Sequence, residues 1–157
     1  MTYYDEIAES YEQLHGEEQL SKAKLVLANL KIKPSDTLLD VGCGTASYLE
    51  IFKCKKTGID PSAELLKQAK IPVIQGVAEK LPFKDNSFDI VISLTAIHHA
   101  DPKKAVAEML RVAKRDIVIS VLKKASNFKA IEAEISKLKV VKKVEEAHDV
   151  IFFVQKL

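Results

Sequence analysis

Tryptophan is absent from the 157 residues of this sequence, and cysteine, glycine and proline are scarce, with two, five and five residues respectively. So few cysteines exclude a disulfide framework, and the low glycine and proline contents exclude a collagen-like or low-complexity chain. Hydrophobic residues make up 47% and charged residues 29%, the balance of an ordinary globular domain that buries its own core. We therefore expect a single domain over residues 1–157.

Long apolar runs and early basic residues are missing too. The longest apolar runs, such as 117–122 (IVISVL), are far shorter than the roughly 18 residues that cross a bilayer. The first 21 residues contain six carboxylates and no lysine or arginine, whereas a secretory signal starts basic and continues apolar. These patterns predict a cytoplasmic protein with no membrane insertion. Cys43 and Cys54 have no other Cys or His at ligand spacing, so we expect two reduced thiols, with neither a disulfide nor a metal site.

Charge is distributed unevenly along the chain. Residues 103–143 carry twelve basic side chains against four acidic ones, while residues 1–21 carry six acidic side chains and no basic one. Such asymmetry is typical of a surface for nucleic acid or for an acidic partner. The alternative is lysine on the solvated faces of helices, and it is favoured because arginine, the better phosphate ligand, contributes only two of the twelve.

Two hydrophobic periods alternate along the chain. Helical spacing predicts helices over 17–30, 48–52, 62–69, 102–113 and 128–138, and β-prone runs predict strands at 37–41, 56–60, 71–74, 88–94, 117–122, 140–144 and 150–154. Because strand and helix alternate without an internal repeat, we expect one doubly wound α/β sheet, mainly parallel, with helices on both faces. Pro72 predicts an edge position for its strand, since proline cannot donate a ladder hydrogen bond. Ser62 and Asp101 are the expected N-caps of the helices that follow them.

Ligands of an open parallel sheet bind beyond the carboxyl ends of its strands, and three segments of this chain fall there. The first is 40–45 (DVGCGT), in which glycines let a ligand approach the backbone closely and an acid precedes the turn. The second is Asp60, which can accept hydrogen bonds from both hydroxyls of a ribose. The third is 95–99 (TAIHH), after the central strand. Together they predict a nucleoside site.

Details of the glycine turn indicate which nucleoside binds. A dinucleotide fingerprint would have glycine where Ser47 stands, and no Lys-Ser or Lys-Thr follows the glycines as it would in a P-loop. Asp40, two residues before Gly42, would repel a pyrophosphate but attract an ammonium or sulfonium group. S-adenosylmethionine carries both cations, so it is the cofactor that this turn predicts.

Four segments resemble the motifs of the class I S-adenosylmethionine-dependent methyltransferases of type 11: 38–45 (LLDVGCGT), 58–62 (GIDPS), 76–83 (GVAEKLPF) and 86–93 (NSFDIVIS). The resemblance covers nearly the whole chain. It implies a Rossmann-like sheet of seven strands, mostly parallel with the last strand antiparallel. It also implies N-terminal cap helices over residues 1–30 that fold over the methionine end of the cofactor.

The cofactor-binding residues that the resemblance implies lie in this cap, on the motifs and at the end of the central strand. They are Tyr4, Tyr11, Asp40, Gly42, Cys43, Gly44, Asp60, Pro61, Ala78, Glu79, Leu94 and Thr95. Two positions depart from the family pattern. Val77 stands where many relatives have Asp or Asn near the adenine amino group, so adenine recognition falls to the backbone around Ala78 or to Glu79. Ala46 replaces a third glycine, a change that we expect the start of a helix to tolerate.

His98 and His99 are the candidate catalytic residues. An oxygen or carbon nucleophile needs a base, and imidazole titrates near neutral pH. Two alternatives stand beside proton transfer: both residues line the substrate pocket, which we favour, or one ring packs in the structure while the other is solvated.

The residues after the central strand also bear on the methyl acceptor. Methyltransferases of exocyclic amines and glutamine amides usually carry Asn/Asp-Pro-Pro-Tyr/Phe there, whereas this chain has 93–96 (SLTA), so oxygen or carbon acceptors are favoured over amide nitrogen. The stretch 96–99 (AIHH) resembles both quinone-biosynthesis and wobble-uridine tRNA methyltransferases, which leaves a small molecule or tRNA as the acceptor.

Two further possibilities concern partners and activity. Some small members of this class pair their exposed edge strand with a zinc-binding activator protein, and 71–74 (IPVI) is the edge that would do so here. A catalytically silent regulator that keeps the cofactor fold is the remaining alternative, and Val77 is its one indication.

Overall fold

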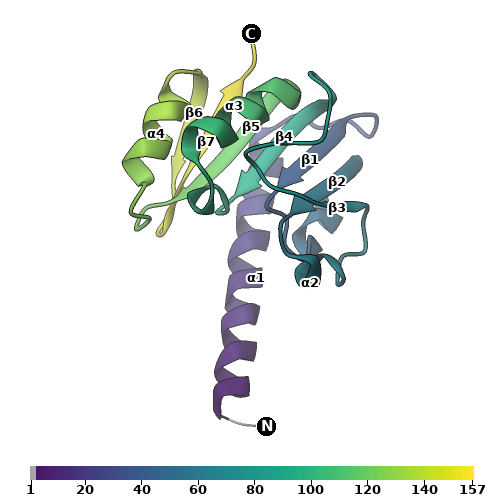
Figure 1. Cartoon of the computed structure of the whole chain (residues 1–157), viewed down its shortest axis with the longest axis vertical. Coiled ribbons are helices and arrows are strands. Elements are labelled where there is room, and N and C mark those ends of the chain that lie inside the picture. The colour runs from purple at the N-terminus through teal and green to yellow at the C-terminus, as the bar shows by residue number, and fades with distance from the viewer. Residues whose placement is uncertain (1–2) are drawn as a thin grey trace.

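The computed structural model describes the chain from residue 3 to residue 157, and its side chains from residue 15 onward. Its centre is a seven-stranded sheet with the order β3-β2-β1-β4-β5-β7-β6 (Figure 1). The strands are β1 (Thr37–Val41), β2 (Lys55–Asp60), β3 (Val73–Gln75), β4 (Phe88–Leu94), β5 (Ala113–Leu122), β6 (Lys139–Glu145) and β7 (Asp149–Gln155). Neighbours are parallel, except that β7 runs antiparallel to both β5 and β6. The predicted Rossmann-like sheet, with its last strand antiparallel, is confirmed.

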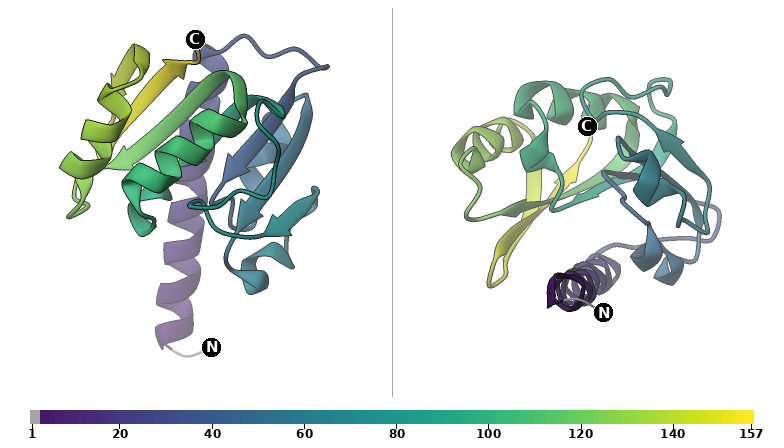
Figure 2. Two further views of the ribbon diagram at one scale, coloured as in Figure 1. Left: turned by 45° about the horizontal axis from the view of Figure 1, so that its top comes forward. Right: turned by 60° about the horizontal axis from the view of Figure 1, so that its bottom comes forward.

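Helices cover both faces of this sheet, as predicted. Figure 2 shows α3 and α4 on one face and α1 on the other, where the 3-10 helix η1 also packs. The helical elements are α1 (Tyr3–Asn29), η1 (Ser47–Ile51), α2 (Ala63–Leu66), η2 (Ile97–His99), α3 (Pro102–Val112) and α4 (Phe128–Ser136). The sheet is therefore the middle layer of three.

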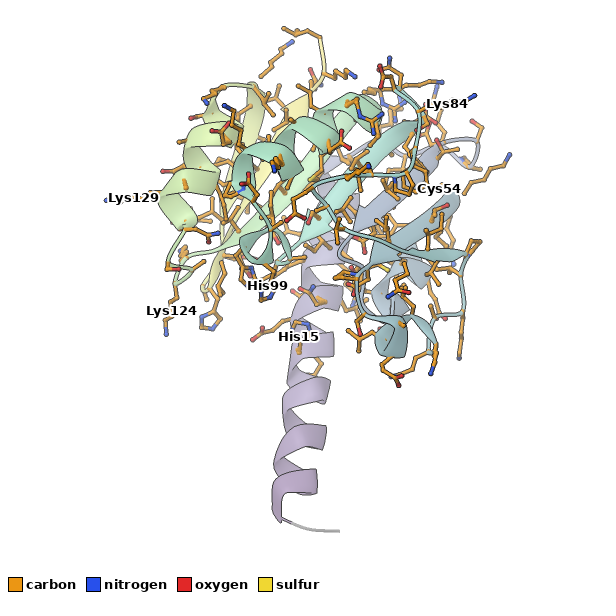
Figure 3. The ribbon with its side chains drawn as sticks, viewed as in Figure 1. His15, Cys54, Lys84, His99, Lys124 and Lys129 are labelled. Atoms are coloured by element: carbon orange, nitrogen blue, oxygen red, sulfur yellow. The ribbon has the colours of Figure 1, made fainter. Side chains whose placement is uncertain are left out.

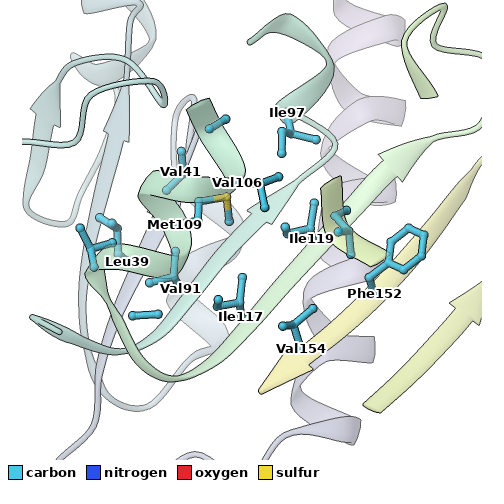
Figure 4. Close-up of a cluster of buried hydrophobic side chains, with 14 of the residues drawn as sticks. Leu39, Val41, Val91, Ile97, Val106, Met109, Ile117, Ile119, Phe152 and Val154 are labelled. Carbon is cyan, nitrogen blue, oxygen red and sulfur yellow. The ribbon is translucent and has the colours of Figure 1, made fainter. Parts of the chain in front are cut away.

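Alternate side chains of each strand enter one of two hydrophobic cores. The first core packs Leu39 and Val91 of the sheet with Met109 of α3 (Figure 4). The second packs Ile90 with Val26 of α1. A fully buried side chain of this size stabilises the fold by about 1.5–3 kcal/mol. The central strand β4 contributes to both cores, because six of its seven residues are buried.

Three short-range predictions concern the ends of helices and strands. The Ser62 hydroxyl accepts a hydrogen bond from the Leu65 N–H at 3.3 Å, and an Asp101 carboxyl oxygen accepts one from the Lys104 N–H at 3.0 Å. Both predicted N-caps are thus confirmed. Pro72 directly precedes β3, which lies at one edge of the sheet as predicted.

The structure differs from the prediction mainly in the connections. The 3-10 helix η1 replaces the helix predicted at 48–52, and α2 keeps only four residues of the helix predicted at 62–69. The chain must return from β1 to β2 within residues 42–54, which leaves little room for an α-helix. Ala46 starts η1 with a left-handed φ of 58°, a conformation that costs a non-glycine residue roughly 1–2 kcal/mol. Alanine is therefore less easily tolerated there than expected.

One continuous helix, α1, occupies Tyr3–Asn29, where cap helices were expected over residues 1–30. Figure 1 shows that α1 extends well beyond the sheet toward the N-terminus. The helix contains no proline, and its single glycine, Gly16, costs only about 1 kcal/mol relative to alanine, so nothing in it forces a break. No helix within residues 3–157 has the length and apolar character of a membrane span.

Candidate functional site

The turn after β1 is built on two glycines in the left-handed region. Gly42 has φ 80° and Gly44 has φ 56°. The Gly42 and Cys43 N–H groups both donate to the Ile59 carbonyl, at 2.8 and 3.1 Å, so β2 holds the turn in place. A Cβ atom at Gly42 would lie 2.4 Å from the Ala96 Cβ. Glycine is therefore required at position 42 both for its φ and for the close approach of the segment after β4.

Asp60 joins this turn to the end of β2. The side chain is buried, and its two carboxyl oxygens accept hydrogen bonds from the Gly44 N–H at 2.9 Å and the Ser62 N–H at 2.8 Å. An ionised carboxylate has about four acceptor positions, so two remain for a ligand. The carboxylate is thus oriented by the backbone at the carboxyl end of the sheet, as a ribose ligand requires.

Two cavities meet at the glycine turn. The larger has a volume of about 470 Å³ and is bounded by the ends of β1, β2 and β4 and by residues 76–79. Its walls include six residues predicted from the sequence: Gly42, Asp60, Pro61, Ala78, Glu79 and His99. The smaller, of about 280 Å³, lies between the turn and α1, and its walls include the predicted Gly42, Cys43 and Gly44. Gly42 and Leu65 line both cavities. The arrangement suits a ligand with two parts joined beside the turn.

The loop at residues 76–79 closes one side of the larger cavity. Gly76 packs closely on β2, because a Cβ atom there would lie 2.7 Å from the Ile59 Cδ1. Val77 is 47% exposed at the cavity wall. A Glu79 carboxyl oxygen accepts a hydrogen bond from the Asp101 N–H at 3.3 Å, so this side chain is partly engaged by the loop before α3. Backbone groups of the loop remain available to a base in the cavity.

Asp40 does not reach either cavity wall. Its side chain is fully buried beneath the turn, where one oxygen accepts a hydrogen bond from the Tyr48 hydroxyl. Burial is the main reason that the pKa of Asp40 rises from 3.8 to about 7; the nearby Asp60 carboxylate adds to the rise, and the bond from Tyr48 opposes it. Asp40 lines neither cavity, so its predicted role in binding a cationic ligand stays a prediction, in which the carboxyl group acts on the ligand through the turn.

Leu94, the last residue of β4, and Thr95, which follows it, line neither cavity and are contacted by α1. Gln19 Nε2 donates to the Leu94 carbonyl at 2.8 Å, and Lys22 Nζ donates to Thr95 Oγ1 at 2.6 Å. Lys22 also forms a buried ion pair with Asp149 of β7 at 2.5 Å. Leu94 and Thr95 are thus held by α1 instead of lining either cavity.

Thr95 is strained as well as anchored. Its φ of 54° is unusual for a β-branched residue, and such backbone strain persists only where the surroundings enforce it. Its N–H donates to Ser120 Oγ at 2.7 Å. Sequence reasoning missed the anchoring residues Gln19, Lys22, Ser120 and Asp149. The only signal in the sequence is that Lys22 lies three residues before the apolar stretch at 25–28 and Asp149 directly precedes an apolar strand.

His98 and His99 lie on η2, directly after the Ala96 segment that approaches the turn. Their ring centroids are 3.9 Å apart. His99 is exposed and lines the larger cavity, while His98 is half-buried and its Nδ1 has no hydrogen-bond partner among the described residues. Burial, followed by the neighbouring His99, lowers the pKa of His98, which keeps the imidazole neutral at pH 7. Figure 3 shows His99 at the same end of the sheet as His15 of α1.

The two predicted tyrosines and the two cysteines complete the list of residues singled out from the sequence. The side chains of Tyr4 and Tyr11 lie outside the described residues, so their contact with the cofactor stays a prediction. Cys43 is buried and Cys54 half-buried, both as free thiols whose pKa is raised by burial. Among the side chains described, no three or more His, Cys, Asp or Glu residues are placed to hold a metal ion.

Comparison with known proteins agrees with this geometry. A family model for a methyltransferase domain matches residues 39–121. The chain belongs to this methyltransferase family. Membership of this family indicates S-adenosylmethionine as the cofactor. The residues present fit that group, because the glycine turn leaves the backbone open to both cavities and Asp60 keeps acceptor positions at the end of β2.

Curated relatives are longer than this chain. An uncharacterized protein of Methanocaldococcus jannaschii is 40% identical over 119 residues, which are 73% of this chain and 47% of that protein. The demethylmenaquinone methyltransferase of Renibacterium salmoninarum is 35% identical over 124 residues, which are 71% of this chain and 52% of the enzyme. The chain thus spans about half the length of these relatives.

Solved structures share the whole fold. A S-adenosylmethionine-dependent methyltransferase from Aquifex aeolicus superposes with a TM-score of 0.73 at 22% identity, over 86% of this chain and 89% of that chain. A methyltransferase in complex with the Haloferax volcanii Trm112 methyltransferase activator superposes with a TM-score of 0.79 at 18% identity, over 96% of each chain.

Proposed function

We propose that this chain transfers the methyl group of S-adenosylmethionine to an oxygen or carbon atom of an acceptor. The observation that carries the proposal is the Asp60 carboxylate at the end of β2. Two backbone N–H groups hold it at the wall of the larger of two cavities that meet at a glycine turn. Adenosine fits the larger cavity and the amino-acid tail fits the smaller one. The cofactor supplies a methyl carbon activated by a positively charged sulfur.

The chain's own residues act mainly by positioning. Asp60 accepts hydrogen bonds from the ribose hydroxyls, the backbone of the turn at 42–45 holds the amino-acid tail, and the backbone of residues 76–79 borders the base. Orientation of two reacting groups contributes roughly 7–11 kcal/mol to the barrier reduction in favourable cases. A methyltransferase therefore needs no indispensable chemical group beyond those that hold the two substrates.

His98 is proposed as the general base for a hydroxyl or carbon acid. Its lowered pKa leaves the imidazole neutral at pH 7, and Nδ1 is a buried atom with no partner among the described residues. His98 does not line the larger cavity, so its ring must turn toward the acceptor site for this nitrogen to accept a proton. His99, on the cavity wall, is proposed to line the acceptor site. If His98 is the base, His98→Gln should lower kcat by about 10²- to 10⁴-fold while the Kd for S-adenosylmethionine stays unchanged.

A small molecule is the acceptor that we favour, with tRNA as the second candidate. The demethylmenaquinone methyltransferase relative supports the first. For the second, Lys124 and Lys129 are exposed on the side of α4, and Figure 3 places Lys124 near the end of the sheet that carries His99. Several other lysines of residues 103–143 form ion pairs with glutamates, which reduces the net charge available to phosphate.

Three experiments test these assignments. Calorimetry with S-adenosylmethionine and S-adenosylhomocysteine should show binding of both; folded protein that binds neither would favour a silent regulator or a subunit that needs a partner. Radiolabelled methyl transfer to bulk tRNA and to small-molecule extracts then separates the acceptors. Binding to tRNA through lysines should weaken steeply with salt, whereas binding unchanged between low and high salt would refute a phosphate surface.

A small activator protein on β3 is proposed as a partner. The backbone of this edge strand is paired on one side only, and Ile74 is 40% exposed. The similar fold of the methyltransferase in the Haloferax volcanii Trm112 complex supports this partner. Ile74→Lys should abolish co-purification with a Trm112-type activator, while Val141→Lys on the opposite edge strand, where the side chain is 50% exposed, should not. Equal retention by both variants would contradict this interface.

A further inference from the structure

Asp40 is fully buried beneath the glycine turn, and its two carboxyl oxygens differ in their hydrogen bonding. Oδ2 accepts the hydrogen bond from the Tyr48 hydroxyl, whereas Oδ1 has no hydrogen-bond partner among the described residues. An ionised carboxylate in an apolar surrounding needs donors for both oxygens. With one oxygen unmatched, the neutral carboxyl form is favoured in the ligand-free protein.

The titratable groups around Asp40 supply no compensating positive charge. Asp60 on β2 raises the pKa of Asp40, and the Tyr48 hydroxyl on η1 lowers it. The Cys43 thiol in the turn is itself buried and its pKa is raised, so it remains uncharged. Because burial outweighs the bond from Tyr48, the pKa of Asp40 reaches about 7, where a nearby charge has its greatest effect on protonation.

The remaining elements around Asp40 leave one place for such a charge. On β4 its partner in the sheet is the apolar Ile92, and α1 contributes His15 to the wall of the smaller cavity. The turn that follows Asp40 is shared by both cavities, since Gly42 and Leu65 line each of them. A ligand with adenosine in one cavity and an amino-acid tail in the other has the sulfur that joins these parts beside this turn.

We propose that Asp40 determines specificity for the charged cofactor: it carries a proton in the ligand-free protein and releases it when a sulfonium lies at the turn. S-adenosylmethionine and S-adenosylhomocysteine have the same adenosine, amine and carboxylate groups and differ by one methyl group and its positive charge. The ammonium is common to both ligands, so it favours the ionised carboxylate equally in both complexes, and only the sulfonium of S-adenosylmethionine adds a further positive charge that stabilises it. The chain thereby retains the methyl donor and releases the neutral product. This inference rests on the proposed cofactor binding.

Calorimetry of the two ligands with the wild-type chain tests the proposal. Between pH 6 and pH 8 the Kd for S-adenosylmethionine should fall about tenfold more than the Kd for S-adenosylhomocysteine, because the ionised fraction of a group with a pKa near 7 rises about tenfold over that interval. At pH 7, titrations in two buffers of different ionisation enthalpy should show release of roughly half a proton with S-adenosylmethionine and a smaller release with S-adenosylhomocysteine. Parallel changes of the two Kd values would overturn the proposal.

Two variants assign the proton to Asp40. In Asp40→Asn the extra pH dependence and the released proton should disappear, and the ligand's own amine remains as an internal reference. Tyr48→Phe keeps the carboxyl group but removes its hydrogen bond, so the pH profile for S-adenosylmethionine should move to higher pH. An unmoved profile in Tyr48→Phe, or a wild-type profile in Asp40→Asn, would overturn the inference. A wild-type chain that binds neither ligand would instead overturn the proposed function and, with it, this inference.

Discussion

Gly42→Ala should destabilise the fold for two separable reasons. The residue has φ 80°, and the left-handed region costs alanine roughly 1–2 kcal/mol. The new Cβ would also lie 2.4 Å from the Ala96 Cβ, and such overpacking costs about 1–3 kcal/mol. We therefore expect the free energy of unfolding to fall by roughly 2–5 kcal/mol in total.

Two other glycines provide matched controls for this experiment. Gly44 has φ 56°, but a Cβ there would lie 3.8 Å from Leu65 Cδ1, an ordinary contact. Gly44→Ala should therefore show the backbone cost alone, roughly 1–2 kcal/mol. Gly16 lies within α1 with nothing within 4 Å of an added Cβ, so Gly16→Ala should raise stability by up to about 1 kcal/mol.

Urea unfolding followed by circular dichroism measures all of these changes. A double-mutant cycle with Ala96→Gly separates the two costs at Gly42, because removing the Ala96 methyl group relieves only the steric one. The Gly42→Ala/Ala96→Gly pair should show a favourable coupling of about 1–3 kcal/mol. Equal losses for Gly42→Ala and Gly44→Ala, or a coupling near zero, would refute the close packing of the β1 turn against the segment after β4.

Three further predictions concern charged groups. Asp60→Ala removes the carboxylate proposed for the ribose, and calorimetry should show a rise of at least about tenfold in the Kd for S-adenosylmethionine; an unaltered Kd would count against that role. Lys22→Met leaves the Asp149 carboxylate buried without its cation, so the free energy of unfolding in urea should fall by about 3–5 kcal/mol. The control Lys104→Met, at an exposed position, should lower it by less than about 0.5 kcal/mol. Equally small losses for both variants would contradict the buried pair. Folding raises the pKa of Asp40 from 3.8 to about 7, so the stability it contributes is present below about pH 4 and lost as the pH rises through 7. Wild type should therefore lose about 4 kcal/mol relative to Asp40→Asn over this interval, and parallel pH curves for the two proteins would show that the carboxyl is solvated.

Features with a local cause are the ones that could be predicted before the structure. The N-caps at Ser62 and Asp101 involve hydrogen bonds within three residues, and Pro72 limits its strand through its own missing N–H. The apolar run of β4 indicates burial on both faces by composition alone. The position of Asp60 was predictable as well, because the end of a β-prone run in the sequence marks the end of the strand.

Connection geometry and the environment of Asp40 could not be predicted in this way. The short return from β1 to β2 makes η1 a 3-10 helix and puts Ala46 in the left-handed region, although its residues have helical spacing. The same η1 brings the Tyr48 hydroxyl onto Asp40 and excludes water from it. A carboxylate read from the sequence as a ligand contact is in this way converted into a buried group with a raised pKa.

Short-range chemistry along the chain is thus sufficient to locate the strands, the glycine turn and Asp60, since propensity, capping and alternation act over a few residues. Packing alone brings together Lys22, Thr95 and Asp149, which come from three elements distant in the chain. No local pattern encodes such a contact, because it depends on how α1 lies across the sheet. The elements that carry the proposed cofactor site therefore follow from sequence, and the charge state and strain around them follow from the fold.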